Sequence, residues 1–132
     1  MENRELSPEG SAIAWEVIET EKSLIDIRNS HATFSFLVSD AQKKSKGKKV
    51  CAECEKVPDK YKWSIPADFT ITVFEPNVEG FSEEQKRILM LHELLHVGIV
   101  FNEDGSETYC TVPHDYEDFK EIFDRYGTEW SL

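Results

Sequence analysis

The sequence predicts an α+β domain in which a small mixed or antiparallel sheet packs against a central helix. Three segments, residues 8–28, 83–97 and 116–126, carry apolar residues at helical spacing. Short runs rich in β-branched or alternating apolar residues between them predict strands at 33–38, 49–57, 68–74 and 107–112. A chain of 132 residues is expected to form one domain, spanning residues 1–132.

The N-terminal part is predicted as a long helix followed by a β-hairpin. Ser7 is placed to act as the N-cap and Pro8 to occupy the first helical position, so a helix is expected from there to about Arg28. A strand at Thr33–Val38 follows. Its expected hairpin partner is Lys49–Val57, across a lysine-rich turn.

The central part is predicted as a strand that leads into a capped helix. Asp68–Phe74 alternates apolar and polar residues, as in a strand with one buried face. Ser82 and Gln85 have the spacing of a capping box at the start of a helix. This helix is expected to run to about Val97, with Gly98 as the residue that ends it.

The C-terminal part is predicted as a strand and a last helix. A turn at 102–105 precedes the strand Glu107–Val112. Asp115 is placed to act as the N-cap of a C-terminal helix from about Tyr116 to Tyr126.

The central helix carries the pentad His92-Glu93-Leu94-Leu95-His96. Residues four apart lie on the same face of a helix, so His92 and His96 are expected to turn their imidazoles to one metal ion. Glu93 lies about 100° around the helix from His92, where it is placed to reach a water bound to that metal. This pattern predicts a zinc-dependent hydrolase, most often a peptidase, with Glu93 as the general base.

A third metal ligand is needed, and three downstream residues are candidates. The metzincin continuation of the pentad fails, because its positions hold Ile99 and Asn102. Glu117 or Glu121 fits a pattern with a glutamate on a later helix. His114 is the preferred candidate, because it stands between the predicted strand and the last helix, at a rigid position.

Other polar residues near this segment have candidate roles that the sequence leaves open. Asp115 and Asp118 are placed to orient a ligand imidazole through its second nitrogen, although both are also expected at a helix start. Tyr109 or Tyr116 is a candidate hydrogen-bond donor to an oxyanion. Packing in the core or exposure at the surface is the simpler expectation for both tyrosines.

Several segments in order resemble the metallopeptidases encoded by bacteriophages and prophages. They are residues 43–48, 68–73 and 82–87 leading into the pentad, then His114-Asp115-Tyr116-Glu117-Asp118-Phe119, Tyr126-Gly127 and Trp130. The resemblance runs from about residue 30 to the end, and the segment beginning at His114 is its more specific mark. It implies a small zincin-like domain with His92, His96 and His114 as zinc ligands and Glu93 as base. It also implies an origin in a phage or prophage.

The acidic composition of the chain limits which partners it is expected to bind. A net charge of −11 argues against non-specific binding to nucleic acids or anionic membranes. No apolar run is long enough to span a bilayer, and no signal-peptide core follows Met1. We therefore expect a cytoplasmic protein, and the resemblance to phage metallopeptidases implies that the cell is a bacterial host. We also expect a monomer with a peptide or protein as substrate.

A lysine-rich segment departs from the acidic composition. Five of the 15 lysine and arginine residues lie within positions 43–49: Lys43, Lys44, Lys46, Lys48 and Lys49. An exposed turn around Gly47 is the expected structure. A binding surface for nucleic acid or a protein partner is the alternative.

The three cysteines are expected to be reduced thiols, because their number is odd. Cys51 and Cys54 form a C-x-x-C pair that, together with Cys110 and His31, has the ligand types of a second, structural zinc site. Residues three apart in a regular strand point to opposite faces, so packing is the favoured role.

The function predicted from the sequence is a zinc metallopeptidase. Its substrate is expected to lie antiparallel along an exposed sheet edge, with Asp68–Phe74 as the candidate edge strand. The alternative is a zinc-stabilised interaction module, such as a phage-encoded binder of a host factor, that keeps the metal site but cleaves nothing. Only hydrolysis requires Glu93, whereas metal binding and folding require the histidines.

Overall fold

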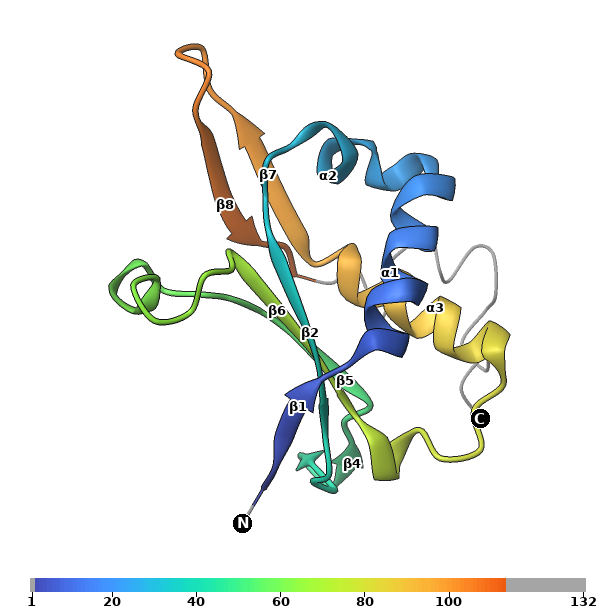
Figure 1. Cartoon of the computed structure of the whole chain (residues 1–132). Helices are drawn as coiled ribbons and strands as arrows, with labels where there is room; N and C mark the ends of the chain where they lie inside the picture. The colour runs from blue at the N-terminus through green and yellow to red at the C-terminus, as the bar shows by residue number, and fades with distance from the viewer. Residues whose placement is uncertain (1, 114–132) are drawn as a thin grey trace.

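The computed structural model describes residues 2–113, and these confirm the α+β class (Figure 1). The predicted C-terminal helix lies outside the described residues. The helices are α1 (Pro8–Thr20), α2 (Ile25–Asn29) and α3 (Glu83–Leu94), with 3-10 turns η1 (Lys22–Leu24), η2 (Asp59–Tyr61) and η3 (Glu75–Asn77). The strands are β1 (Arg4–Leu6), β2 (Phe34–Ser39), β3 (Lys44–Ser45), β4 (Lys48–Lys49), β5 (Ala52–Lys56), β6 (Phe69–Phe74), β7 (Val97–Phe101) and β8 (Glu107–Thr111).

The main sheet is mixed, with the strand order β1-β2-β6-β5. β2 runs parallel to β6, while β1 and β5 are antiparallel to their neighbours. The predicted hairpin between β2 and β5 is therefore wrong, because β6 lies between them. β6 is the most buried of these strands, with Phe69, Ile71 and Phe74 in the core, and it is paired on both sides.

The helices α1 and α3 cover one face of this sheet (Figure 1). Phe36 of β2 and Ile71 of β6, which are register partners, pack there against Ala14 and Val17 of α1 and Leu91 of α3. Ion pairs from Arg87 to Glu16 and Glu21 also join α3 to the end of α1. No helix within residues 2–113 has the length and apolar character to cross a membrane.

The first helix is shorter than the sequence pattern predicts. The Ser7 N-cap is confirmed by the bond from the Gly10 N–H to Ser7 Oγ, but α1 ends at Thr20 rather than near Arg28. Glu21 adopts an extended backbone, and the Arg28 guanidinium donates to the carbonyl oxygens of Ile18 and Glu21. Arg28 thus provides hydrogen-bond donors for carbonyl oxygens at the C-terminal end of α1. The apolar spacing that predicted one long helix continues through η1 and α2.

The central helix begins as predicted, with both hydrogen bonds of the Ser82–Gln85 capping box present. It ends at Leu94 instead of Val97, and Gly98 lies inside β7 rather than at a helix cap. Gly98 faces Cys110 across the β7–β8 hairpin. A Cβ at position 98 would lie 2.6 Å from Cys110 Sγ, so close cross-strand approach explains the glycine.

Replacing Gly98 with Ala is therefore expected to destabilise the fold by about 1–3 kcal/mol through overpacking. Chemical denaturation of Gly98→Ala measures this loss in the free energy of unfolding. In a Cys110→Ala background the sulfur is absent, and Gly98→Ala should cost less there. An equal cost in both backgrounds would show that contact with Cys110 does not select the glycine.

Candidate active site

The two histidines of the pentad meet at the end of α3. His92 and Glu93 lie in the last turn of the helix, and His96 lies in the turn between α3 and β7. The ring centroids of His92 and His96 are 5.3 Å apart, with the ring planes at 69°. The sequence prediction that both imidazoles approach one point is consistent with this geometry, even though the helix ends before His96.

Two hydrogen bonds to Val112 hold His96. The Val112 N–H donates to the His96 carbonyl oxygen at 2.6 Å, which continues the β7–β8 pairing by one step. The His96 Nδ1 lies 2.6 Å from the Val112 carbonyl oxygen. A carbonyl only accepts, so Nδ1 carries the proton of this hydrogen bond, and in the tautomer that this bond selects the lone pair lies on Nε2. This is the ligand arrangement common at protein zinc sites.

Glu93 is a buried carboxylate in the same place. Its residue exposure is only 5%, and its Oε2 lies 3.9 Å from His92 Nε2. Burying a carboxylate is costly unless polar or charged groups surround it. This cost distinguishes Glu93 from the buried apolar residues of α3, and its carboxylate lies beside the His92 ring.

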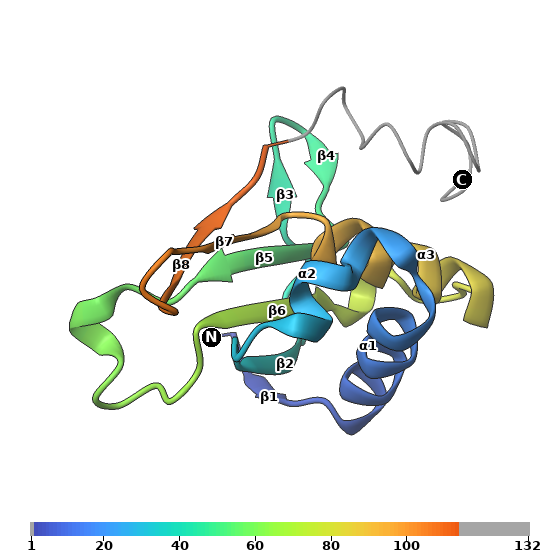
Figure 2. The same cartoon turned by 90° about the horizontal axis from the view of Figure 1, so that it is seen from above.

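A cleft of about 400 Å³ opens at these three side chains. One wall is formed by His92, Glu93 and His96. Strand β5 and the end of β8 form the rest, and the lining residues there are Ala52, Glu53, Cys54, Thr111, Val112 and Pro113. Figure 2 shows how β5 and the β7–β8 hairpin approach the end of α3. The contribution of β5 was not predicted, because the sequence pattern assigned β5 to β2 as a partner, whereas it pairs with β6.

The cysteines do not form the second zinc site considered from the sequence. Cys51, Cys54 and Cys110 form no disulfide, and His31 bonds instead to Glu107. Residues 2–113 contain no group of three or more metal-ligating side chains that would hold an ion. Burial, and then the negative charges of Glu93 and Glu55, raise the pKa of Cys54 to about 12.

This shift in Cys54 predicts slow alkylation. With a pKa of about 12, roughly one thiol in 10⁴ is ionised at pH 8, and the thiolate is the reactive form. Iodoacetamide at pH 8 should therefore label the exposed Cys110 well before Cys54, as measured by peptide mass mapping. Labelling of Cys54 at the rate of Cys110 would contradict the placement of Cys54 beside Glu93.

The described residues supply two of the three expected ligands. His114, Glu117 and Glu121 lie outside the described residues, as do Asp115, Asp118 and Tyr116. Tyr109 is described, and it does not line the cleft. Its hydroxyl donates to Glu107 at 2.7 Å, and its ring packs on Phe69, so Tyr109 is a packing residue rather than an oxyanion donor.

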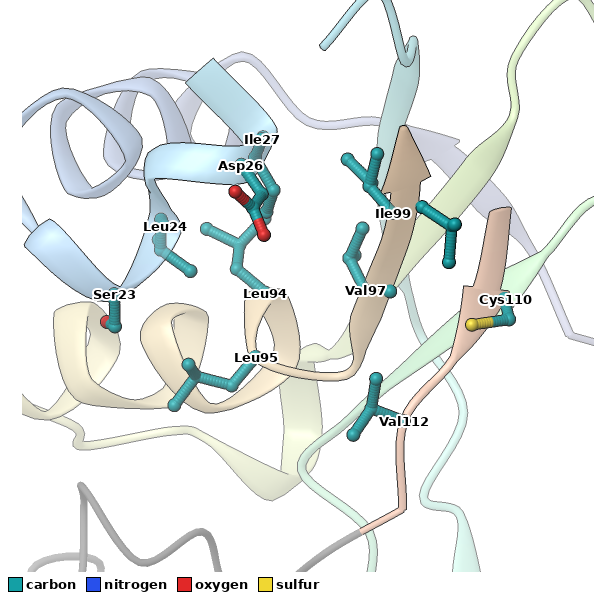
Figure 3. Close-up of a pocket in the computed structure, with 12 residues that line it drawn as sticks. Ser23, Leu24, Asp26, Ile27, Leu94, Leu95, Val97, Ile99, Cys110 and Val112 are labelled. Carbon is teal, nitrogen blue, oxygen red and sulfur yellow. The ribbon is translucent and has the colours of Figure 1, made fainter. Parts of the chain in front are cut away.

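A second hollow of about 360 Å³ lies on the other side of the β7–β8 hairpin (Figure 3). It runs between α2 and β7, and most of its lining is aliphatic, including Leu24, Leu95 and Val97. Among the lining residues, only Asp26 and Cys110 have side chains of a type that binds metal ions. The two imidazoles and the buried carboxylate line the first cleft instead.

The α+β fold and the pentad at an open cleft define a metallopeptidase-like site. The chain belongs to the family described as "Putative phage metallopeptidase", whose model matches residues 3–131. The family description implies a metal-dependent hydrolase and an origin in phages. No curated protein and no solved structure matches the chain.

Proposed function

We propose that the protein is a zinc-dependent peptidase that hydrolyses a bond in an extended polypeptide. We also propose that it acts as a monomer in the bacterial host cell of a phage or prophage. The observation that carries the proposal is the placement of His96 by Val112 beside His92 and the buried Glu93. Two imidazoles on one side of an open cleft match the donor set that zinc takes at catalytic sites.

His92, His96 and His114 are the proposed zinc ligands. Pro113, the last described residue, lines the cleft. His114 is the residue that follows Pro113 in the sequence. This proximity favours His114 over Glu117 and Glu121, which lie further along the chain.

The proposed chemistry divides between the metal and Glu93. Zinc bound at this site would lower the pKa of a bound water to about 7 and polarise the scissile carbonyl. Glu93 would accept the proton of the attacking water and later deliver it to the leaving amine nitrogen. The hydrogen bond from His96 to Val112 keeps the imidazole orientation constant through these steps.

The substrate is proposed to pair with β5. The edge strand expected from the sequence, Asp68–Phe74, is wrong for this role because β6 is paired on both sides. β5 is an outer strand of the four-stranded sheet and lines the cleft with Ala52 and Cys54. An extended polypeptide beside it would gain main-chain hydrogen bonds.

The register of β5 supports a proposal for the backbone groups that would pair with this substrate. The Phe74 N–H donates to Cys51 and the Val57 N–H to Asp68. In an antiparallel ladder, hydrogen-bonded positions alternate, so Glu53 and Glu55 also point their backbone groups at β6. The backbone groups of Ala52, Cys54 and Lys56 therefore point to the outer edge.

Wild-type protein purified without added metal is expected to contain about one zinc ion per chain, as at a mononuclear zinc site. His92→Ala, His96→Ala and His114→Ala should each lose it, whereas Glu117→Ala should keep it. Metal analysis of the folded variants measures this. A wild type that cannot take up zinc contradicts the proposal. Loss of zinc in Glu117→Ala together with its retention in His114→Ala would make Glu117 the third ligand.

Glu93→Gln is expected to keep the fold and the zinc but to lower the cleavage rate by on the order of 10²–10⁴. The amide has nearly the size of the carboxyl group but does not accept a proton at neutral pH. Cleavage of a peptide library, zinc content and thermal stability are measured on the same samples. Equal behaviour of wild type and Glu93→Gln in all assays would favour the non-catalytic interaction module.

A further inference from the structure

The lysine-rich segment forms a tight hairpin, β3–β4, that gathers positive charge. Lys44 faces Lys49 directly across it, although like charges opposite each other destabilise a strand pair. Lys46 and Gly47 form its turn with φ values of 53° and 78°. Asn, Asp or Gly is the usual first residue where both φ values are positive, so Lys46 holds a position unfavourable to lysine.

The base of this hairpin is fastened to the sheet. The buried Asn77 side-chain amide donates to the carbonyl oxygens of Lys43 and Val50, both at 2.8 Å. Lys43 also forms an ion pair with Glu53 and lies over the Phe74 ring. Lys43 is therefore part of the attachment, and the hairpin is held at a defined place.

The other four lysines of the hairpin differ from Lys43. Lys44, Lys46, Lys48 and Lys49 are all exposed. Within the described residues, none of the four has a carboxylate oxygen within 4.0 Å of its ammonium group, whereas Lys62 and Lys86 both do. In a chain with a net charge of −11, this is a concentrated cationic surface with no acidic partner among residues 2–113.

The β3–β4 hairpin is followed directly by β5, the strand that lines the cleft. Lys49 precedes Ala52 by three residues, so their Cα atoms are separated by at most about 11 Å. Figure 2 shows β3 and β4 beside the start of β5. A polypeptide antiparallel to β5 would run from the Lys56 end to the Ala52 end. Its residues beyond the cleaved bond would then approach the hairpin.

We propose that the β3–β4 hairpin recognises acidic side chains on the C-terminal side of the bond that is cleaved. The inference rests on the proposed peptidase function and assigns it a substrate class, polypeptides with Asp or Glu after the scissile bond. Because the rest of the chain is strongly acidic, such a substrate is attracted mainly at the hairpin, which fixes its direction in the cleft. The same acidic surroundings oppose a nucleic acid, which carries charge along its whole length.

The test uses the zinc-loaded full chain and a randomised peptide library, with the products identified by mass spectrometry. Wild type should enrich Asp and Glu within a few residues after the cleaved bond. Lys44→Glu/Lys49→Glu should lower the ratio of acidic to neutral substrates cleaved by about three- to tenfold at low salt and favour basic substrates instead. Lys22→Glu/Lys60→Glu makes the same change in net charge at exposed positions away from the cleft and should keep the wild-type preference.

The outcomes separate the two proposals. Wild-type cleavage with no acidic enrichment, or equal selectivity in the two double variants, contradicts the hairpin proposal and leaves the peptidase intact. No cleavage by zinc-loaded wild type rejects the peptidase and the substrate class together. Hairpin variants that lose only oligonucleotide binding, or only thermal stability, would assign the lysines to a nucleic acid or to an intramolecular contact and overturn the inference.

Discussion

Two hydrogen bonds between His96 and Val112 join the end of α3 to the end of β8, and both ends line the cleft. One bond links their backbones, and the other links the His96 ring to the Val112 carbonyl oxygen. The first closes the β7–β8 hairpin against the end of α3, and the second selects the His96 tautomer. Together they hold Val112 and Pro113 at the cleft that the two imidazoles also line.

The mixed sheet supplies the opposite side of the cleft. β6, the most buried strand, takes a central position, and β5 lies at the edge of the sheet beside α3. The helix-facing residues of β5, Ala52 and Cys54, are small, which leaves room at the buried Glu93. The lysine hairpin lies beside the start of β5, where an extended peptide is proposed to bind.

Sequence patterns that depend on neighbouring residues, such as helix caps and helical spacing, predicted the local structure well. The Ser7 and Ser82 caps form as expected, and the spacing of His92 and His96 brings their rings together. Each of these features depends on residues within one or two turns of helix. The roles of β2, β5 and β6 were mispredicted because strand order depends on pairing between distant segments, which alternation within one strand does not specify.

Two further features required the tertiary structure. Gly98 has the sequence signature of a helix end, but contact with Cys110 in the neighbouring strand explains it. The bond from His96 to Val112 involves a backbone carbonyl, which any residue type at position 112 would provide. The third ligand remains a prediction from sequence, supported by the position of Pro113 at the cleft.

X-ray absorption at the zinc edge of the metal-loaded protein tests the proposed metal site most directly, because it reports the atoms bound to the metal. We expect three imidazole nitrogens at about 2.0–2.1 Å, together with one or two oxygen atoms. In His114→Ala the imidazole scattering should fall by one ligand or the zinc should be lost. A sulfur atom at about 2.3 Å, or an unchanged spectrum in His96→Ala, would contradict the site described for this protein.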